Sequence, residues 1–96
     1  MAAFAPSFVS LSVLVVEPDR DLSLTFDTIL GHDGHTVTVS SNASSAMDAV
    51  SRQPYELAFI GTRIGASAIE ALGKALRAAG NDTAIVLVAG LAEHVD

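Results

Sequence analysis

The sequence Leu-Ala-Phe-Ile-Gly at residues 57–61 is an apolar run that ends in a glycine. Short continuous apolar runs are typical of parallel strands that are covered on both faces. In an open parallel sheet, ligands and reactive groups gather beyond the carboxyl ends of the strands. Gly61 holds that position without a side chain. We therefore expect the ligand-binding edge of this sheet to lack a reactive group at its centre.

Three further segments have the character of strands. Residues 11–16 and 84–89 are apolar and rich in β-branched residues, whereas residues 35–39 alternate polar and apolar side chains. The alternating segment is expected to have one solvent-exposed face and to lie at an edge of the sheet. Segments with helical spacing separate the strands. The order βαβαβαβ predicts a parallel sheet with helices on both faces.

The helical segments are marked by capping residues and by apolar residues spaced three and four apart. Asp19 or Asp21 is expected to cap the first helix and Asn42 the second, while Gly31 and Gly80 are expected to end the first and the third. The three apolar stripes are Leu22, Phe26, Ile29 and Leu30; Ala43, Ala46, Met47 and Val50; and Ile69, Leu72, Leu76 and Ala79. We expect one domain over residues 11–96, after a loose lead-in at 1–10, with residues 90–96 beginning another helix.

Composition excludes several classes of protein. The 96 residues are 50% hydrophobic and carry a formal net charge of -6, which suits one small folded domain and argues against nucleic-acid binding. There is no cysteine, so disulfides and thiolate chemistry are excluded. No positive region precedes the apolar start as in a signal peptide, and no apolar stretch approaches the roughly 20 residues of a membrane span. We predict a cytoplasmic protein.

Four motifs resemble those of bacterial response-regulator receiver domains, in the same order along the chain. They are residues 13–19 (VLVVEPD), 31–37 (GHDGHTV), 55–61 (YELAFIG) and 84–90 (AIVLVAG). The resemblance runs from about residue 11 to the end. It implies a flavodoxin-like, three-layer αβα fold with a parallel sheet. The family's strand order is 2-1-3-4-5, so this chain is expected to have the order 2-1-3-4, with the fifth strand and the last helix absent.

The resemblance also implies a phosphoryl switch. In the family, acidic residues after the first strand hold Mg²⁺, and an aspartate after the third strand accepts phosphate from a kinase histidine. A hydroxyl after the fourth strand and a lysine after the fifth respond to that phosphate. A divalent ion neutralises charge during such a transfer, and the lysine and hydroxyl grip the product.

This chain departs from the family at nearly every one of those positions, and the lysine position lies beyond the end of the sequence. The acidic pair is replaced by Glu17 and Pro18, with Asp19 next in the chain, the phosphoacceptor by Gly61 and the switch hydroxyl by Ala89. Magnesium needs several well-placed oxygens, and this set offers few. We therefore predict a degenerate pseudo-receiver with no cofactor, no metal and no enzymatic activity. It would regulate two-component signalling through protein contact.

The missing fifth strand predicts where that contact occurs. Residues Ile85, Val86, Leu87 and Val88 would form an open edge strand, and the first helix would lie alone on its face of the sheet. Open apolar edges recruit other strands. We expect completion by a second copy, by a downstream segment if the chain is a truncated piece, or by a partner. The candidate partners are a histidine kinase, a phosphotransfer protein and the protein's own output domain.

Two alternative functions stay open. A flavodoxin-like ligand-binding or enzymatic domain would use the crevice at the strand ends, where Glu17, Asp19, Thr62 and Arg63 are the available polar groups. A receiver with a non-standard phosphoacceptor would use Asp19.

Other residue patterns have simpler interpretations. His32, Asp33 and His35 are expected to form a turn and not a metal site. Thr62 and Ser67 are expected to act as helix caps and not as nucleophiles, and His94 is expected to be solvated. Gly73, within the alanine-rich third helix, is expected to permit close packing on the sheet. The alternative is a smooth surface on which another helix docks.

Overall fold

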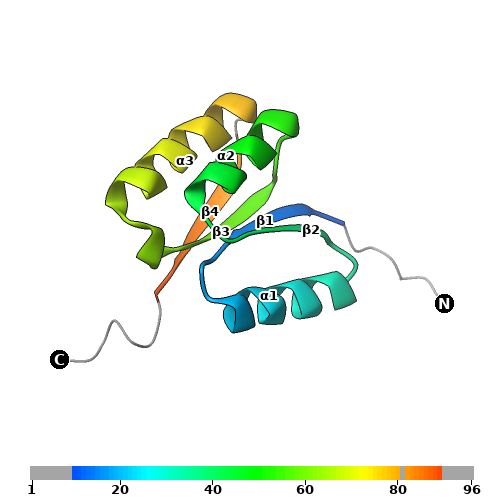
Figure 1. Ribbon diagram of the computed structural model, residues 1–96. Coiled ribbons are helices and arrows are strands. Elements are labelled where there is room, and N and C mark those ends of the chain that lie inside the picture. Colours follow the sequence, from blue (N-terminus) through cyan, green and yellow to red (C-terminus); the bar gives the residue numbers. More distant parts are fainter. Residues whose placement is uncertain (1–9, 81, 90–96) are drawn as a thin grey trace.

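The computed structural model describes residues 10–80 and 82–89. The elements follow the order β1 (Ser12–Val16), α1 (Arg20–His32), β2 (Thr36–Ser40), α2 (Ala43–Arg52), β3 (Leu57–Gly61), η2 (Thr62–Ile64), α3 (Ala66–Ala79) and β4 (Ala84–Val88). The strands form one parallel sheet in the order β2-β1-β3-β4 (Figure 1). This architecture confirms the predicted fold and strand order. Residues 1–9 of the predicted lead-in, the helix expected at 90–96 and His94 lie outside the described residues.

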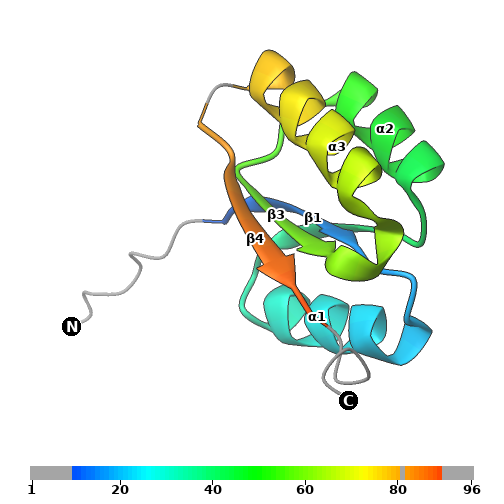
Figure 2. The same ribbon diagram turned by 90° about the vertical axis from the view of Figure 1, so that its left-hand side faces the viewer.

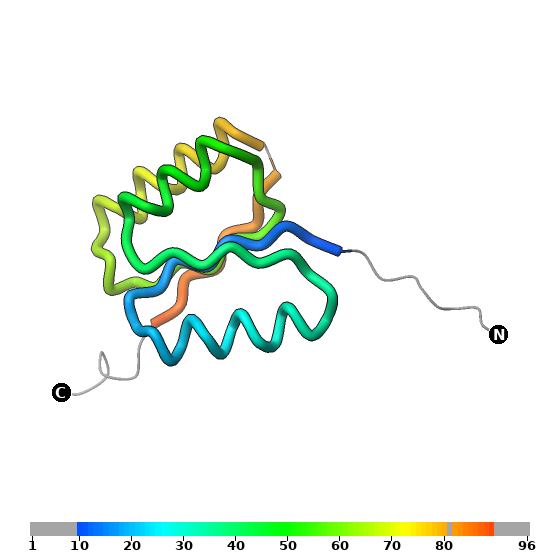
Figure 3. Tube along the Cα trace, turned by 45° about the vertical axis from the view of Figure 1, so that its right-hand side comes forward, coloured from blue at the N-terminus to red at the C-terminus, as the bar shows by residue number. Residues whose placement is uncertain are grey.

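Helices α2 and α3 cover one face of the sheet, and α1 lies on the other (Figures 1 and 3). Alternation along the strands sends side chains to both faces. The main core lies under α2 and α3 and contains Leu14, Val16, Ala46, Ala49, Val50, Tyr55, Ala58, Ile60, Leu72 and Leu76. Under α1, Val13 and Val15 are fully buried, and the rings of Phe26 and Phe59 lie 4.8 Å apart.

The helix ends show which capping predictions hold. Asp19 caps α1 by accepting from the backbone of Asp21 and Leu22, and Asn42 caps α2 by accepting from Ser45. The prediction that Gly31 ends α1 is wrong, because α1 continues to His32. The chain turns at Gly34, whose φ of 89° is in the left-handed region that favours glycine.

The third helix also corrects one capping prediction. Gly65, with a φ of 98°, precedes α3 and provides no side-chain cap, so Ser67 lies inside the first turn and does not cap the helix. At the other end Gly80 is the C-cap, as predicted, and its N–H donates to the Leu76 carbonyl.

Both edges of the sheet lie where the sequence predicted them. β2 is one edge, although its alternation breaks at the end, where Val39 is exposed and Ser40 is buried. β4 is the other edge among the described strands, and Figure 2 shows it at the outer side of the sheet. Val86 and Leu87 are 41% and 52% exposed. Within the described part of the chain, β4 therefore presents apolar side chains and pairs with β3 alone.

Candidate functional site

The carboxyl ends of β1, β3 and β4 bring together the positions that the sequence singled out. Val16 pairs with Ile60, and Gly61 pairs with Val88. Glu17 follows β1, Gly61 ends β3 and Ala89 follows β4. The register therefore places these three residues together at the carboxyl ends of the parallel strands, where such folds hold ligands.

The Glu17 carboxylate occupies the space above Gly61. A Cβ placed on Gly61 would overlap Glu17 Oε1 and lie 3.0 Å from Glu17 Cδ. Any side chain at position 61 would therefore compete with Glu17 for the same volume. The acidic group at this end of the sheet therefore comes from the residue after β1 and not from the end of β3.

Glu17 is buried, with 4% exposure, and one hydrogen bond holds its carboxylate while another holds its backbone. Its Oε2 accepts a hydrogen bond of 2.8 Å from the Asp19 N–H, and its own N–H donates to the Ser40 carbonyl at 2.9 Å. Burying a carboxylate is costly unless hydrogen bonds compensate. These bonds fix the carboxylate in place above the glycine.

Neither residue after Glu17 adds an acidic group to the space over Gly61. Pro18 is exposed, and its side chain has no ligand atom. Asp19 is also exposed, and its Oδ1 accepts from the N–H groups of Asp21 at 3.0 Å and Leu22 at 3.3 Å. The Asp19 carboxylate thus serves as the N-cap of α1.

The last position of the predicted pocket, Ala89, also lacks the expected chemistry. Ala89 is exposed and has no hydroxyl. Thr62 carries the nearest hydroxyl along the chain after Gly61 and begins the short helix η2, where its carbonyl accepts from the Gly65 N–H at 3.1 Å.

A shallow pocket of about 440 Å³ lies beside the carboxyl ends of β1 and β2, next to the start of α1. It is lined by Glu17, Pro18, Arg20, Ser23, Leu24, Val39 and Ser41. Thr62 and Arg63, which the sequence offered as further polar groups for a ligand, do not line it. Among the described residues that line it, only Glu17 and Arg20 are charged, and the Glu17 carboxylate already accepts a hydrogen bond from the Asp19 backbone.

The His32, Asp33 and His35 cluster forms the turn between α1 and β2. His35 Nδ1 accepts from the Leu11 N–H at 3.0 Å, and Ser10 Oγ donates to the Gly34 carbonyl at 2.8 Å. His35 therefore fastens the segment before β1 to this turn. No group of three or more potential metal ligands occurs within residues 10–80 and 82–89.

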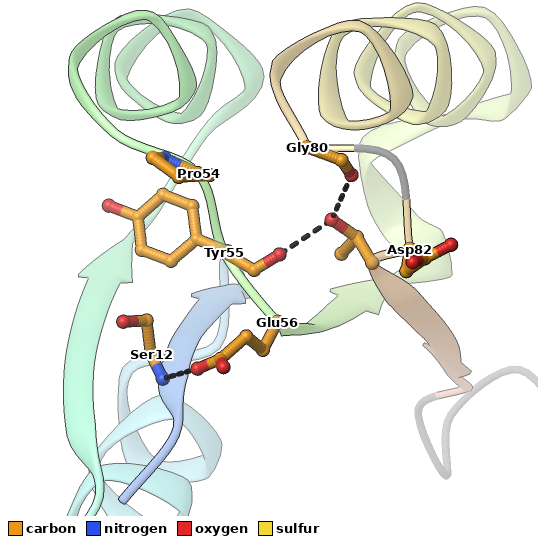
Figure 4. Close-up of a pocket in the computed structure, with 7 residues that line it drawn as sticks. Ser12, Pro54, Tyr55, Glu56, Gly80 and Asp82 are labelled. Atoms are coloured by element: carbon orange, nitrogen blue, oxygen red, sulfur yellow. Dashed lines mark hydrogen bonds between the residues drawn. The ribbon is translucent and has the colours of Figure 1, made fainter.

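The sequence did not predict a set of hydrogen bonds that side chains make at the opposite end of the sheet, where the strands begin. Figure 4 shows Glu56 reaching the N–H of Ser12, which donates to Glu56 Oε1 at 2.8 Å. Thr83 Oγ1 donates to the Tyr55 carbonyl at 2.5 Å. These bonds satisfy backbone groups at the strand starts, around a shallow pocket of about 400 Å³. A polar residue directly before an apolar run is a weak signal for such a role.

Comparison with solved structures identifies the fold. The chain superposes on a CheY-like response-regulator receiver domain from Methylobacillus flagellatus with a TM-score of 0.72 and 24% identity, over 92% of this chain and 76% of that one. A response regulator from Thermotoga maritima gives a TM-score of 0.73 and 24% identity, over 92% of this chain and 71% of that one. No protein-family model matches the sequence. No curated protein matches it either.

These superpositions show that the chain has the receiver-domain fold, as the motifs at residues 13–19, 31–37, 55–61 and 84–90 predicted. No helix in the described part of the chain is long and apolar enough to cross a membrane.

Proposed function

We propose that this chain is a pseudo-receiver of bacterial two-component signalling, which regulates by protein contact and does not pass through an aspartyl phosphate. The observation that carries the proposal is the position of the Glu17 carboxylate above Gly61. The receiver fold at TM-scores of 0.72 and 0.73 supports the signalling class.

The chemistry of phosphoryl transfer explains why this arrangement argues against a phosphoacceptor. The transfer needs a nucleophilic oxygen in line with the phosphorus, and a metal ion that neutralises the oxygens. Gly61 supplies no oxygen, and its neighbouring space is filled by Glu17. Glu17 itself is buried and hydrogen-bonded to the Asp19 backbone, so it has neither the access nor the freedom of an attacking group.

The same reasoning weakens the idea of Asp19 as a non-standard acceptor. Its Oδ1 binds two backbone N–H groups at the start of α1. Transfer of a phosphoryl group to the capping oxygen of Asp19 would break these two hydrogen bonds. We therefore favour a structural role for Asp19.

Without the phosphate switch, contact surfaces remain as the means of signalling. The exposed edge strand β4, with Ile85, Val86, Leu87 and Val88, is the surface we propose. A histidine kinase, a phosphotransfer protein or an attached output domain fits the proposal as partner. The module would act in the cytoplasm and would catalyse no reaction.

A small-ligand domain is the second candidate, and the 440 Å³ pocket beside Glu17 and Arg20 favours it. Arg20 offers a cation for an anionic ligand, but the buried Glu17 carboxylate opposes it. A thermal-shift screen with nucleotides and acidic metabolites tests this candidate. Stabilisation that is lost in Arg20→Ala would support ligand binding, because ligands that bind the native state raise its stability.

The test of the proposed function is phosphorylation in solution. The chain is incubated with Mg²⁺ and acetyl phosphate, and its intact mass is measured, with a conventional receiver domain as positive control. We expect no adduct on this chain and one phosphate on the control. An acid-stable, base-labile adduct that is absent from Asp19→Asn or Glu17→Gln would overturn the proposal and identify the acceptor.

A further inference from the structure

We propose that the β2 edge of the sheet, together with the flank of α1 beside it, binds a second copy of this chain about a two-fold axis at Val39. We call Arg20, Leu24 and Asp27 of α1 and Val39 of β2 the β2-edge patch. The inference goes beyond the proposed function, which places partner contact at β4, and does not rest on it. Self-association is measured without a phosphodonor, so the two proposals fail or succeed separately.

The position of β2 does not depend on the residues that follow the described chain. In the order β2-β1-β3-β4, β2 pairs with β1, and the chain leaves the sheet after β4 at the opposite edge. A fifth strand in the family's order would be added beyond β4. Residues 90–96, which the structure does not describe, follow β4 directly and do not follow β2.

The surface around Gly73 of α3 is a different case. A Cβ placed on Gly73 would have no atom within 4 Å, so the predicted close packing of Gly73 on its own sheet is not found within the described chain. Gly73 lines the same groove as Ile85 and Leu87 of β4. This groove borders the strand that residues 90–96 follow, and we base no inference on it.

The end of β2 reverses the usual placement of apolar and polar side chains. Val39 is 42% exposed, whereas the next residue, Ser40, is buried and hydrogen-bonded to Ser45 of α2. Leu24 of α1 is 50% exposed and lines the same shallow pocket as Val39. Removing apolar side chains from water is favourable. This neighbouring pair would therefore gain stability from being covered.

Strand β2 lacks the features that keep edge strands apart. Natural edges are blunted with charges, prolines or bulges, and residues 36–41 contain neither a charged residue nor a proline. The Ser40 carbonyl accepts from the Glu17 N–H, so the backbone groups of Ser40 face β1. Neighbouring residues of a strand direct their backbone groups to opposite sides. The N–H and carbonyl of Val39 therefore face away from β1, toward the side where a further strand could pair.

A two-fold axis perpendicular to the sheet makes the two β2 strands antiparallel. With the axis at Val39, the Val39 N–H of each copy donates to the Val39 carbonyl of the other. The two Val39 side chains then face each other on the side that α1 covers, each beside its own Leu24. The same axis keeps both α1 helices on that side. The exposed apolar pair of one copy is thus covered by the same pair of the other.

The charges on α1 are self-complementary about this axis. Arg20, Leu24 and Asp27 follow the spacing i, i+4 and i+7 and lie on one flank of the helix. Leu24 is near the midpoint between the two charged residues. Antiparallel α1 helices that meet at Leu24 set each Arg20 opposite Asp27 of the second copy. Neither Arg20 nor Asp27 has an ion-pair partner among the residues that the structure describes.

Electrostatics favour a second copy over a strongly charged partner. The patch carries one exposed cation, Arg20, and one exposed anion, Asp27, so a strongly acidic or basic partner would meet a like charge. Glu17 also lines the pocket, but it is buried and accepts from the Asp19 N–H. The net charge of -6 makes most approaches of two copies repulsive. At this patch, by contrast, two ion pairs form at once.

A single introduced cysteine tests the axis directly, because the chain contains none. Val39→Cys would place two thiols on residues whose Cα atoms are about 5.5 Å apart in a hydrogen-bonded antiparallel pair, which is within disulfide range. Val86→Cys is the matched control, since Val86 is 41% exposed on the other edge strand. Under mild oxidation of the full chain we expect disulfide-linked dimers to form at least about tenfold faster for Val39→Cys. Equal rates, or faster linking of Val86→Cys, would overturn the proposal.

Sedimentation equilibrium of the full chain over a range of concentrations measures association itself, and we expect a dimer. Arg20→Asp and Asp27→Arg each place like charges at both symmetry-related contacts and should raise the dissociation constant about tenfold. The double variant Arg20→Asp/Asp27→Arg restores opposite charges and should return the constant to near its starting value. Both positions are exposed, and circular dichroism checks that each variant keeps its helices.

Val39→Lys adds a charge at the axis and should abolish the dimer, whereas Val86→Lys should leave it unchanged. The opposite result would overturn the proposal and place the contact at β4. A chain that stays monomeric at all concentrations, or a charge swap that does not restore association, would overturn it as well.

Discussion

The carboxylate of Glu17 fills the volume that a side chain at Gly61 would occupy. The two residues are 44 positions apart in sequence, as their numbers show, and the pairing of Val16 with Ile60 makes them neighbours. The glutamate that follows β1 and the absence of a side chain at the end of β3 are thus two parts of one packing arrangement. A substitution at either position therefore changes the space available to the side chain at the other.

A first prediction concerns this packing. Gly61→Ala forces a new methyl group against the Glu17 carboxylate and should lower the free energy of unfolding by about 1–3 kcal/mol. In a Glu17→Ala background the same substitution should cost much less, because the competing group is gone. Urea unfolding of the four proteins gives the coupling energy. Equal costs of Gly61→Ala in both backgrounds would contradict the steric relationship.

Gly73→Ala is the matched control for that experiment and a second prediction. Space around Gly73 is open, and alanine is the better helix former. We expect the free energy of unfolding of the monomer to rise by about 0.5–1 kcal/mol. Urea unfolding of this variant is the measurement, and a lowered free energy of unfolding would contradict the open surroundings of Gly73.

A third prediction follows from the cap of α1. Asp19→Ala removes the acceptor for the N–H groups of Asp21 and Leu22 and should cost about 0.5–2 kcal/mol of stability. Asp19→Asn retains an oxygen at the same place and should cost much less. Thermal unfolding of both variants is the measurement. Equal losses for alanine and asparagine would show that Asp19 does not act as a cap.

The turn at His35 gives a fourth prediction. His35→Ala leaves the Leu11 N–H without its 3.0 Å acceptor and should loosen the segment before β1. Faster hydrogen exchange at Leu11, with little change at the buried strand residue Val15, would confirm a local fastening. An unchanged exchange rate at Leu11 would mean that the hydrogen bond to His35 does not protect this N–H group.

The strands and helices could be predicted because periodicity records burial. Residues 13–16 and 57–60 read as continuous apolar runs, and the structure covers both with helices or neighbouring strands. The position of a side chain relative to a neighbouring strand could not be predicted in the same way. The sequence shows that Glu17 and Gly61 replace expected residues, but only the register and the side-chain path show that one fills the place of the other.

The errors at the helix ends have a similar origin. Gly31 and Gly34 are both plausible stops, and local sequence does not tell which of them takes the left-handed conformation. At Gly73 the sequence was compatible with packing inside the domain or outside it. The choice required the positions of neighbouring atoms, since the same small residue suits both.

A fifth prediction tests whether the arrangement at Glu17 and Gly61 can be reversed. Gly61→Asp alone should be strongly destabilising, because two carboxylates would then compete for one buried space. Glu17→Asp shortens the competing side chain by one methylene, so the double variant Glu17→Asp/Gly61→Asp should regain part of the lost stability. Adding Pro18→Asp supplies a further oxygen ligand for Mg²⁺. Stabilisation by Mg²⁺ that is present in this triple variant and absent in the unsubstituted chain would show that the metal-binding geometry of the fold persists. A triple variant that folds but is not stabilised by Mg²⁺ would show that the ends of β1 and β3 do not hold the three carboxylates in a metal-binding geometry.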